Sequence, residues 1–297
     1  MAAATLGDLV NEVRYLLRSF TGQHDRTTYV TSALTGSDLT IPVADGDAVA
    51  TGIVEIDDEL LWVDSSAGGS LTVPPYGRGY QGTAAATHLI NTQVLVDPSF
   101  PRQAIKTALA QTAMAVYPTL FQVKPTEFTF TAGQASYDLE ADADRVLAIS
   151  YQTWGGSGIW QPVDKYRLDT NANTTSFPSG RALTIGQGAP PGRTIRVLYA
   201  ASFTEMTATG DTLAAAGHAE SHRDVLVFGA AARLVQYLEP SRLTMNAIEN
   251  EERAKYVGSG AASALTRQLL GFYEQRLGEE RKKMLDRYPV TRSFRNW

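Results

Sequence analysis

Apolar residues mark helices in several parts of the chain. Over about residues 5–20 they recur at spacings of three and four, and Thr5 with Asp8 is suited to a capping box at the start. A second amphipathic stretch covers 101–117 and is bounded by Pro101 and Pro118. The stretch 224–238 is apolar on nearly all sides. We therefore expect an interior helix there, too short to span a bilayer.

The last part of the chain is also helical in pattern. We expect a polar helix over about 240–256, a flexible break over 258–263 and a long final helix that Pro289 ends. An apolar stripe at spacings of three, four and seven is typical of core or of a seam with a partner helix. In the final helix this stripe consists of Leu270, Tyr273, Leu277, Met284 and Tyr288.

Two groups of short apolar runs, separated by turn residues, predict strands. The first group covers 29–34, 38–43, 52–56, 60–64, 70–73 and 93–97, and Asp57 with Asp58 predicts a hairpin between two of these runs. The second group covers 127–131, 135–139, 145–154, 159–168, 181–186 and 194–203. Because no helical pattern interrupts it, we expect a sandwich or a small barrel.

These patterns predict an α+β fold. A helical body is expected to consist of an N-terminal helix, a central helix and a C-terminal helical bundle, accompanied by two antiparallel β modules. We divide the chain into an N-terminal helix (1–26), a β module (27–97), a central helix (98–126), an antiparallel β domain (127–217), C-terminal helices (218–287) and an extended tail (288–297).

Composition narrows the function classes. The 297 residues include no cysteine, which excludes disulfides, thiolate zinc sites and cysteine nucleophiles. No apolar run approaches the roughly 20 residues that a bilayer span needs, and the first residues lack a basic lead followed by an apolar region. We expect a protein that is made in the cytoplasm and has no membrane segment.

Charge is uneven along the chain, although the net charge is only −5. Residues 1–99 contain 4 Lys and Arg against 12 Asp and Glu, whereas residues 251–297 contain 10 against 6. The acidic first third argues against a nucleic-acid grip there, because affinity for phosphates comes chiefly from cations. The basic end suits nucleic acid, an acidic protein surface or a solvated helix face.

The segment GRGYQGTAAATH, residues 77–88, is the most specific motif in the chain. Closely spaced glycines permit positive φ and close backbone approach, which predicts a tight loop. A phosphate-binding P-loop needs Lys directly after its last glycine, and Thr83 stands there instead. We therefore predict a structural loop built on Gly77, Arg78, Gly79, Gly82, Thr83 and His88.

Other candidate chemistry is weak. His218 and His222 enclose Glu220, but a zincin needs Glu directly after its first His, so we expect polar residues at a helix entry. The acidic run Glu55, Asp57, Asp58 and Glu59 lacks the order of a calcium loop and predicts a hairpin with solvated carboxylates. No serine lies in a G-x-S-x-G elbow. We expect no catalytic residues, no metal site and no cofactor.

Aromatic residues of the predicted strand domains leave two interpretations open. Trp62, Trp154 and Trp160 lie in or near predicted strands, where they suit either stacking on sugars or ordinary core and interface packing.

The C-terminal extension has the composition of an interface anchor, because Trp and Arg are enriched at binding hot spots. A loose chain end is the other interpretation. The candidate docking residues are Arg287, Tyr288, Arg292, Phe294, Arg295 and Trp297.

The loop at 77–88 also resembles a "V.RG..GT.AA.H..G..V" element of tailed-bacteriophage structural proteins. The chain departs from this element at 74–77, which lies between the first Val and the Arg, and at Asn91, where glycine is common. The matching residues are Val73, Arg78, Gly79, Gly82, Thr83, Ala85, Ala86, His88 and Val94.

The order of elements, together with the phrases YPTLF, ASYDLEADADRVLAIS, APPGRTIRVLYAA and DVLVFGAAARLVQYL, resembles phage head-to-tail adaptor proteins, with 27–97 as an inserted β module. The resemblance implies a twelvefold ring in the neck of the virion. Its partners would be the portal protein, tail-side neck components and copies of itself, and DNA would pass through without sequence-specific binding.

Two other classes remain open from the sequence. One is a tail-tip or baseplate receptor-binding protein that uses its β modules on host glycans. The other is a virion enzyme that degrades cell wall.

Overall fold

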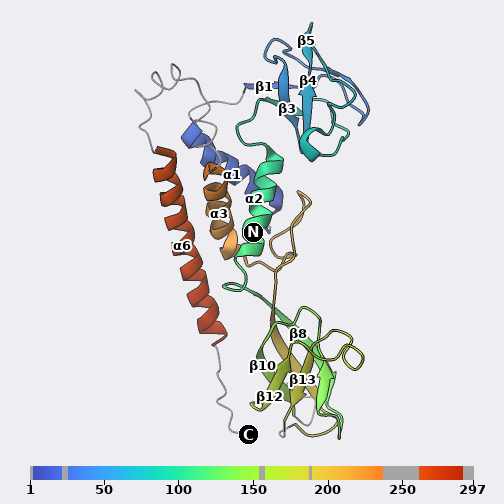
Figure 1. The fold of residues 1–297 in the computed structure, drawn as a ribbon, viewed down its shortest axis with the longest axis vertical. Helices are drawn as coiled ribbons and strands as arrows, with labels where there is room; N and C mark the ends of the chain where they lie inside the picture. Colours follow the sequence, from blue (N-terminus) through green and yellow to red (C-terminus); the bar gives the residue numbers. More distant parts are fainter. Residues whose placement is uncertain (1–2, 22–25, 154–157, 187–188, 237–260, 290–297) are drawn as a thin grey trace.

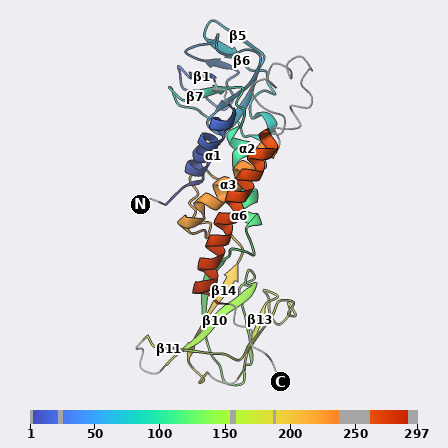
Figure 2. The same cartoon turned by 90° about the vertical axis from the view of Figure 1, so that its left-hand side faces the viewer.

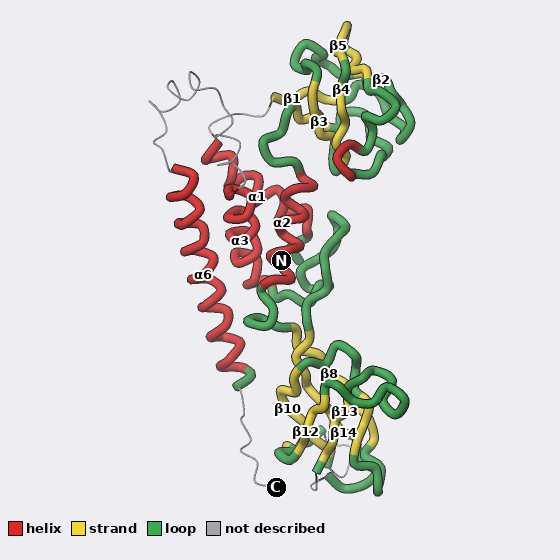
Figure 3. Tube along the Cα trace, viewed as in Figure 1, coloured by secondary structure: helices red, strands yellow, loops and turns green. Residues whose placement is uncertain are grey.

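Three parts follow one another along the long axis of the molecule (Figure 1). The computed structural model describes residues 3–21, 26–153, 158–186, 189–236 and 261–289. A helical body lies between the first β module, which contains β1 to β7, and the second β module, which contains β8 to β14 (Figure 3). The α+β fold class expected from the sequence is confirmed.

The helical body joins segments that are far apart in the sequence (Figure 2). Its described helices are α1 (Leu6–Thr21), α2 (Arg102–Ala115), α3 (Arg223–Gln236) and α6 (Ala261–Arg287). The predicted capping box begins α1, since the Thr5 amide donates to Asp8 at 2.9 Å and the Asp8 amide donates to the Thr5 hydroxyl at 3.2 Å. The common core includes Leu6, Leu9, Val13, Leu17, Ile105, Leu109, Leu226 and Ala230.

Close packing surrounds α3, the interior helix expected from its apolar composition. A Cβ on Gly229 would lie 2.5 Å from Thr112 of α2 and 3.0 Å from the ring of Tyr273 of α6, so only glycine fits. Tyr273, Leu277 and Met284 pack on a second cluster of Val116, Leu120, Phe203 and Val225. Part of the predicted stripe of the final helix therefore belongs to the core of the chain itself.

The first β module consists of two antiparallel sheets around one core. The hairpin predicted around Asp57 and Asp58 is confirmed, because Ile56 pairs with Glu59 and Asp57 takes a φ of 52°. One sheet has the order β1 (Arg26–Tyr29), β7 (Gln93–Val96), β3 (Gly52–Ile56), β4 (Glu59–Val63). The other has the order β2 (Thr40–Pro42), β6 (Ser70–Thr72), β5 (Ser65–Ala67).

The second β module is a sandwich, one of the two expected forms, since two sheets share one core that includes Leu183, Ile195 and Val197. Pro125 lies in the edge strand β8, where a missing N–H is tolerated. One sheet has the order β11 (Trp160–Pro162), β10 (Arg145–Gln152), β14 (Thr194–Ala201), β8 (Gln122–Thr129). The other has the order β12 (Tyr166–Asp169), β13 (Ala182–Ile185), β9 (Ser136–Asp138).

Several boundaries differ from the sequence expectation. The strand expected at 29–34 lies earlier, as β1, because its partner β7 sets the pairing from Arg26 to Tyr29. The strand expected at 127–131 begins at Gln122, where β14 supplies a partner. Residues 261–263, expected in a flexible break, begin α6. The helix expected at 240–256 lies outside the described residues.

Candidate functional site

The loop at 77–88 is built around glycines that its backbone requires. A Cβ on Gly77 would lie 2.7 Å from the carbonyl oxygen of Trp62 in β4, and Gly79 has a φ of 60°. Gly82, with a φ of 83°, ends the short 3-10 helix η1 (Tyr80–Gly82). The Thr83 hydroxyl accepts from the Leu60 amide and donates to the Tyr80 carbonyl. The loop is thereby fastened to β4.

Arg78 connects its own loop to two other segments of the first β module. Its Nε and one terminal nitrogen donate to the two oxygens of Glu59, at 2.7 and 2.9 Å. The remaining N–H groups donate to the carbonyl oxygens of Thr35, Asp38 and Ala86. All five donors of a guanidinium therefore have partners, and its side chain is 5% exposed.

Glu59, the first residue of β4, is the anion that this loop holds. Besides Arg78, it accepts hydrogen bonds from the backbone amides of Gly79 and Ala86, at 3.0 and 2.9 Å. Burial opposes its ionisation, but these hydrogen bonds and that of His88 outweigh burial and lower the pKa of Glu59 to about 2. The glycine-rich cradle thus binds a carboxylate of the chain itself.

His88 closes the same network. Its two ring nitrogens lie 2.9 Å from Asp57 and 2.9 Å from Glu59. Burial alone would lower the pKa of His88, but the hydrogen bonds with Glu59 and Asp57 raise it. Of the predicted loop residues, the structure gathers Arg78, Gly79 and His88 directly around Glu59. Sequence reasoning missed Glu59 as the partner, because nothing in the spacing links a hairpin carboxylate to an arginine 19 positions later.

The neighbouring carboxylates join this β module to the helical body. Arg102, Lys106 and Thr209 all donate to Asp58, at 3.1, 2.7 and 2.6 Å. Burial opposes ionisation of Asp58, but these donors lower its pKa to about 2. Glu55 accepts from the Arg14 side chain and from the Arg102 amide at the start of α2, both at 2.6 Å.

The expectation of solvated carboxylates at this hairpin was therefore wrong for Glu55 and Glu59, whereas Asp57 is exposed and the Asp58 side chain is 43% exposed. Glu55 and Glu59 are 2% and 1% exposed. Cations from distant parts of the sequence pair with these two buried carboxylates. For Glu55, burial outweighs the contacts with Arg14 and Arg102, so its pKa is raised.

Comparison with known families identifies the setting of this architecture. The family model described as SU10 adaptor protein matches residues 4–279, and so spans all three parts. The chain belongs to the SU10 adaptor protein family. Membership makes it a bacteriophage structural adaptor and a component of the virion. No curated protein matches the chain.

The candidate docking residues of this SU10 adaptor lie at and beyond the end of α6. Arg287 is the last residue of that helix, and its guanidinium lies 5.6 Å from the ring centroid of Tyr288. The Tyr288 amide donates to the Met284 carbonyl. Arg292, Phe294, Arg295 and Trp297 lie outside the described residues.

The two histidines of the SU10 adaptor lie at the entry of α3, as the sequence predicted, and are packed in the interior. They are 3% and 4% exposed, their Nδ1 atoms are 3.4 Å apart, and His218 stacks on Phe203 with 3.7 Å between ring centroids. Burial, and then the charge of His222, lowers the pKa of His218 to about 3. Among the described residues, no group of three His, Asp or Glu side chains is arranged to hold a metal ion.

The aromatic candidates are also engaged. Trp62 packs against Tyr80, and the Arg196 guanidinium lies 3.9 Å above the ring of Trp160. Trp154 lies outside the described residues. These contacts agree with ordinary core and interface packing.

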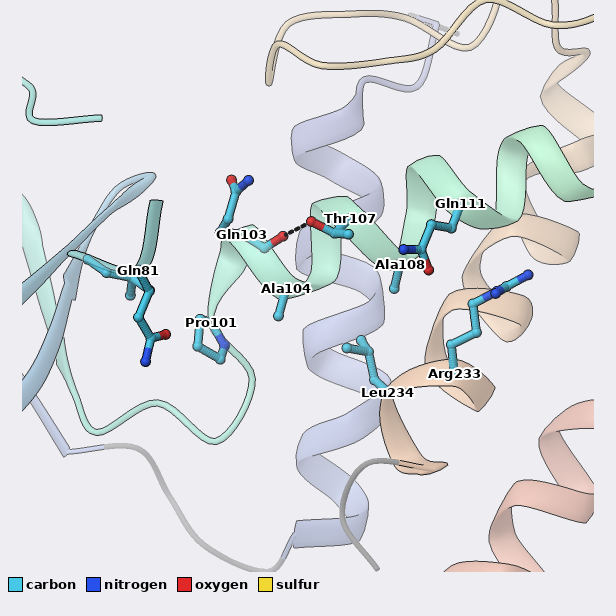
Figure 4. Close-up of a pocket in the computed structure, with 10 residues that line it drawn as sticks. Gln81, Pro101, Gln103, Ala104, Thr107, Ala108, Gln111, Arg233 and Leu234 are labelled. Carbon is cyan, nitrogen blue, oxygen red and sulfur yellow. Dashed lines mark hydrogen bonds between the residues drawn. The ribbon is translucent and has the colours of Figure 1, made fainter. Parts of the chain in front are cut away.

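A groove of about 290 Å³ lies between the first β module, α2 and α3 (Figure 4). Its lining offers amides and small apolar side chains, without a nucleophile and base in contact. Arg233 donates to the Thr112 hydroxyl at 3.1 Å. The lining residues are Leu60, Gln81, Pro101, Gln103, Ala104, Thr107, Ala108, Gln111, Arg233 and Leu234.

Within the described part of the chain, no helix is long and apolar enough to cross a membrane.

Proposed function

We propose that this SU10 adaptor is a head-to-tail adaptor that forms a ring beneath the portal and connects the capsid to the tail. The observation that carries the proposal is the family match over residues 4–279, which includes the helical body and both β modules. The elongated arrangement supports it, because a ring of such subunits exposes different β modules at its two ends (Figure 1). We expect twelve copies in the ring, located in the neck of the virion.

The partners in this proposal are the portal protein, tail-side neck components and other copies of the chain. We assign portal docking to the end of α6 and the extension, with Arg287, Tyr288, Arg292, Phe294, Arg295 and Trp297 as anchors. Arg and Trp are the residue types that contribute most at interfaces. The first β module, residues 27–97 as an insertion in the helical body, lies at the other end of the molecule from the end of α6 and would meet tail-side components (Figure 1).

DNA would pass through the ring without sequence-specific binding. The acidic surplus of residues 1–99, with 4 Lys and Arg against 12 Asp and Glu, supports this view. A surface of the same sign as the phosphate backbone repels DNA and keeps it from adhering to the channel or the outer wall. No catalytic residue and no cofactor enter this mechanism.

Deletion of residues 290–297 tests the docking assignment. Binding to immobilised portal protein should fall strongly, while the circular dichroism and melting temperature of the chain stay unchanged, because the deletion begins after α6 ends. A matched variant with Arg292→Lys and Arg295→Lys keeps the charge and should retain more binding than Phe294→Ala with Trp297→Ala. Undiminished binding by the truncated chain would show that another surface docks.

The receptor-binding alternative is not favoured. The matched family is described as an adaptor, and its match includes the helices as well as the β modules. Two of the aromatic candidates for glycan binding, Trp62 and Trp160, already pack against Tyr80 and Arg196.

A further inference from the structure

A closed ring of identical subunits needs two different contact faces on each copy, because the contact runs head to tail around the ring. We infer that the outer face of α6 in one copy packs against the outer face of α2 in the next. The basic end of α6 then contacts the acidic loop 140–144 of that next copy. This inference rests on the proposed ring and specifies its subunit contact.

The outer face of α2 has the composition of an interface centre. Charged residues are depleted and Met is enriched at the core of protein interfaces. The two cations of this helix, Arg102 and Lys106, are partly buried and pair with Asp58. Met114 is 43% exposed. Every exposed residue of α2 is uncharged, namely Gln103, Ala104, Thr107, Gln111, Met114 and Ala115.

The outer face of α6 ends in positive charge. Arg281, Lys282, Lys283 and Arg287 are exposed, and Asp286 is the one carboxylate among residues 281–287. Lys283 pairs with Glu280 of the same helix at 2.6 Å. Arg281 and Lys282 form no ion pair with any residue that the structure describes, so their charges are open to a partner.

The loop between β9 and β10 carries the opposite charge. It contains Glu140, Asp142 and Asp144 within five residues. Asp142 pairs with Lys124 at 2.6 Å, whereas Glu140 is exposed. The Tyr117 hydroxyl donates to Asp144, which fixes the loop beside the end of α2.

These charged regions lie toward the same end of the helical body. Met284 of α6 packs in one cluster with Val116 and Leu120, which directly follow α2. The basic end of α6 extends past the end of α2 toward the second β module, to which the acidic loop belongs (Figure 1). In Figure 1, α3 lies between α6 and α2 in the helical body. A second copy displaced sideways brings unlike charges together, which favours association and fixes its orientation.

Cross-linking with introduced cysteines tests the two faces, because the natural chain has none. Thr107→Cys marks α2 and Gln268→Cys marks α6, and both positions are exposed. With a short bismaleimide, a mixture of the two single variants should give cross-linked dimers, whereas each variant alone should give none. The double variant should give a ladder of multimers. A control pair with Ser176→Cys in place of Thr107→Cys should not cross-link.

A charge swap tests the pairing of the ends. Lys282→Glu, or Glu140→Lys, should weaken association by roughly fivefold, and the double swap should restore it. Lys165→Glu, an exposed change in the second β module, should leave association unchanged. Sedimentation of each variant, with and without portal protein, measures the assembly.

The outcomes separate the two claims. Rings that form without a link between positions 107 and 268, or single variants that cross-link to themselves, would overturn the inferred contact and leave the ring proposal standing. A chain that never assembles, even with portal protein, would overturn the proposed function itself.

Discussion

Arg78 and Glu59 form a buried pair in which each charge is satisfied by several partners. The pair is nearly free of solvent, with side chains 5% and 0% exposed. Breaking such a pair by removing one partner is far more costly than never having built it, because the remaining charge stays buried. The glycine-rich loop therefore has a structural role, which is to supply the hydrogen bonds that the buried carboxylate of Glu59 requires.

Substitution of Arg78 by Met should lower the local free energy of unfolding of β3 and β4 by about 3–5 kcal/mol, because Glu59 loses its counter-charge. Hydrogen exchange of the amides in these strands measures the loss. Arg196→Met removes an ion pair with Glu127 whose side chains are 40% and 45% exposed, and should cost about 0–1 kcal/mol. Equal losses in the two variants would contradict the structural role of the loop.

His218 makes stability depend on mildly acidic pH. Its pKa is lowered from 6.5 to about 3, so the unfolded chain binds a proton that the folded chain rejects. The contribution of His218 to the free energy of unfolding is fully present above pH 6.5. As the pH decreases from 6.5, this contribution decreases by roughly 1.4 kcal/mol per pH unit. The rings of Phe203 and His222 lie against His218. Nearby, Glu280 accepts hydrogen bonds from Ser221 and Lys283.

The melting temperature of the helical body should therefore be lower at pH 5 than at pH 7, and His218→Phe should reduce that difference. Glu59 does not contribute in this window, because its lowered pKa costs stability only below its usual value of 4.5. His88 acts in the opposite sense, since its raised pKa gives stability that is lost as pH rises above 6.5, and so it reduces the difference between pH 5 and pH 7. A pH response that His218→Phe leaves unchanged would assign the effect to another group.

At the scale of elements, the hairpin between β3 and β4 is the joint between the first β module and the helical body. Glu55 receives the Arg102 amide at the start of α2, and Asp58 receives the Arg102 and Lys106 side chains. The carboxylates also lie at a helix N-terminus, where negative charge is favoured. The first β module and the helical body are therefore held together by ion pairs and hydrogen bonds as well as by the peptide chain.

Asp58→Asn should loosen this joint without unfolding either part. We expect hydrogen exchange in the first turn of α2 to become faster, and thermal unfolding to separate into two transitions, because three hydrogen bonds to Asp58 are weakened. Asp64→Asn, which affects only a contact with Trp62 nearby, serves as the control. A single, unshifted transition in Asp58→Asn would show that other contacts hold the joint.

The elements themselves were largely predictable, because their signals are local. Apolar periodicity gave α1, α2 and α3 to within a few residues, and the turn at Asp57 and Asp58 gave the hairpin. Strand limits such as that of β8 were missed, since they depend on a partner strand more than 60 positions away. The network around Glu59 was missed for the same reason, because its members come together only when the sheets form.

At the scale of the whole molecule, one helical body carries a β module at each end, and the family match covers this entire arrangement. An adaptor must make different contacts at its two ends, and this arrangement provides two different surfaces for them. The proposed ring beneath the portal would expose a different β module at each of its two ends.

The most direct test is to determine the mass and shape of the complex that the purified chain forms with portal protein, by native mass spectrometry and electron microscopy. We predict a closed ring of twelve copies seated on the portal, with its long axis continuing the portal channel. A chain that stays monomeric beside the portal, or that assembles without contacting it, would contradict the account.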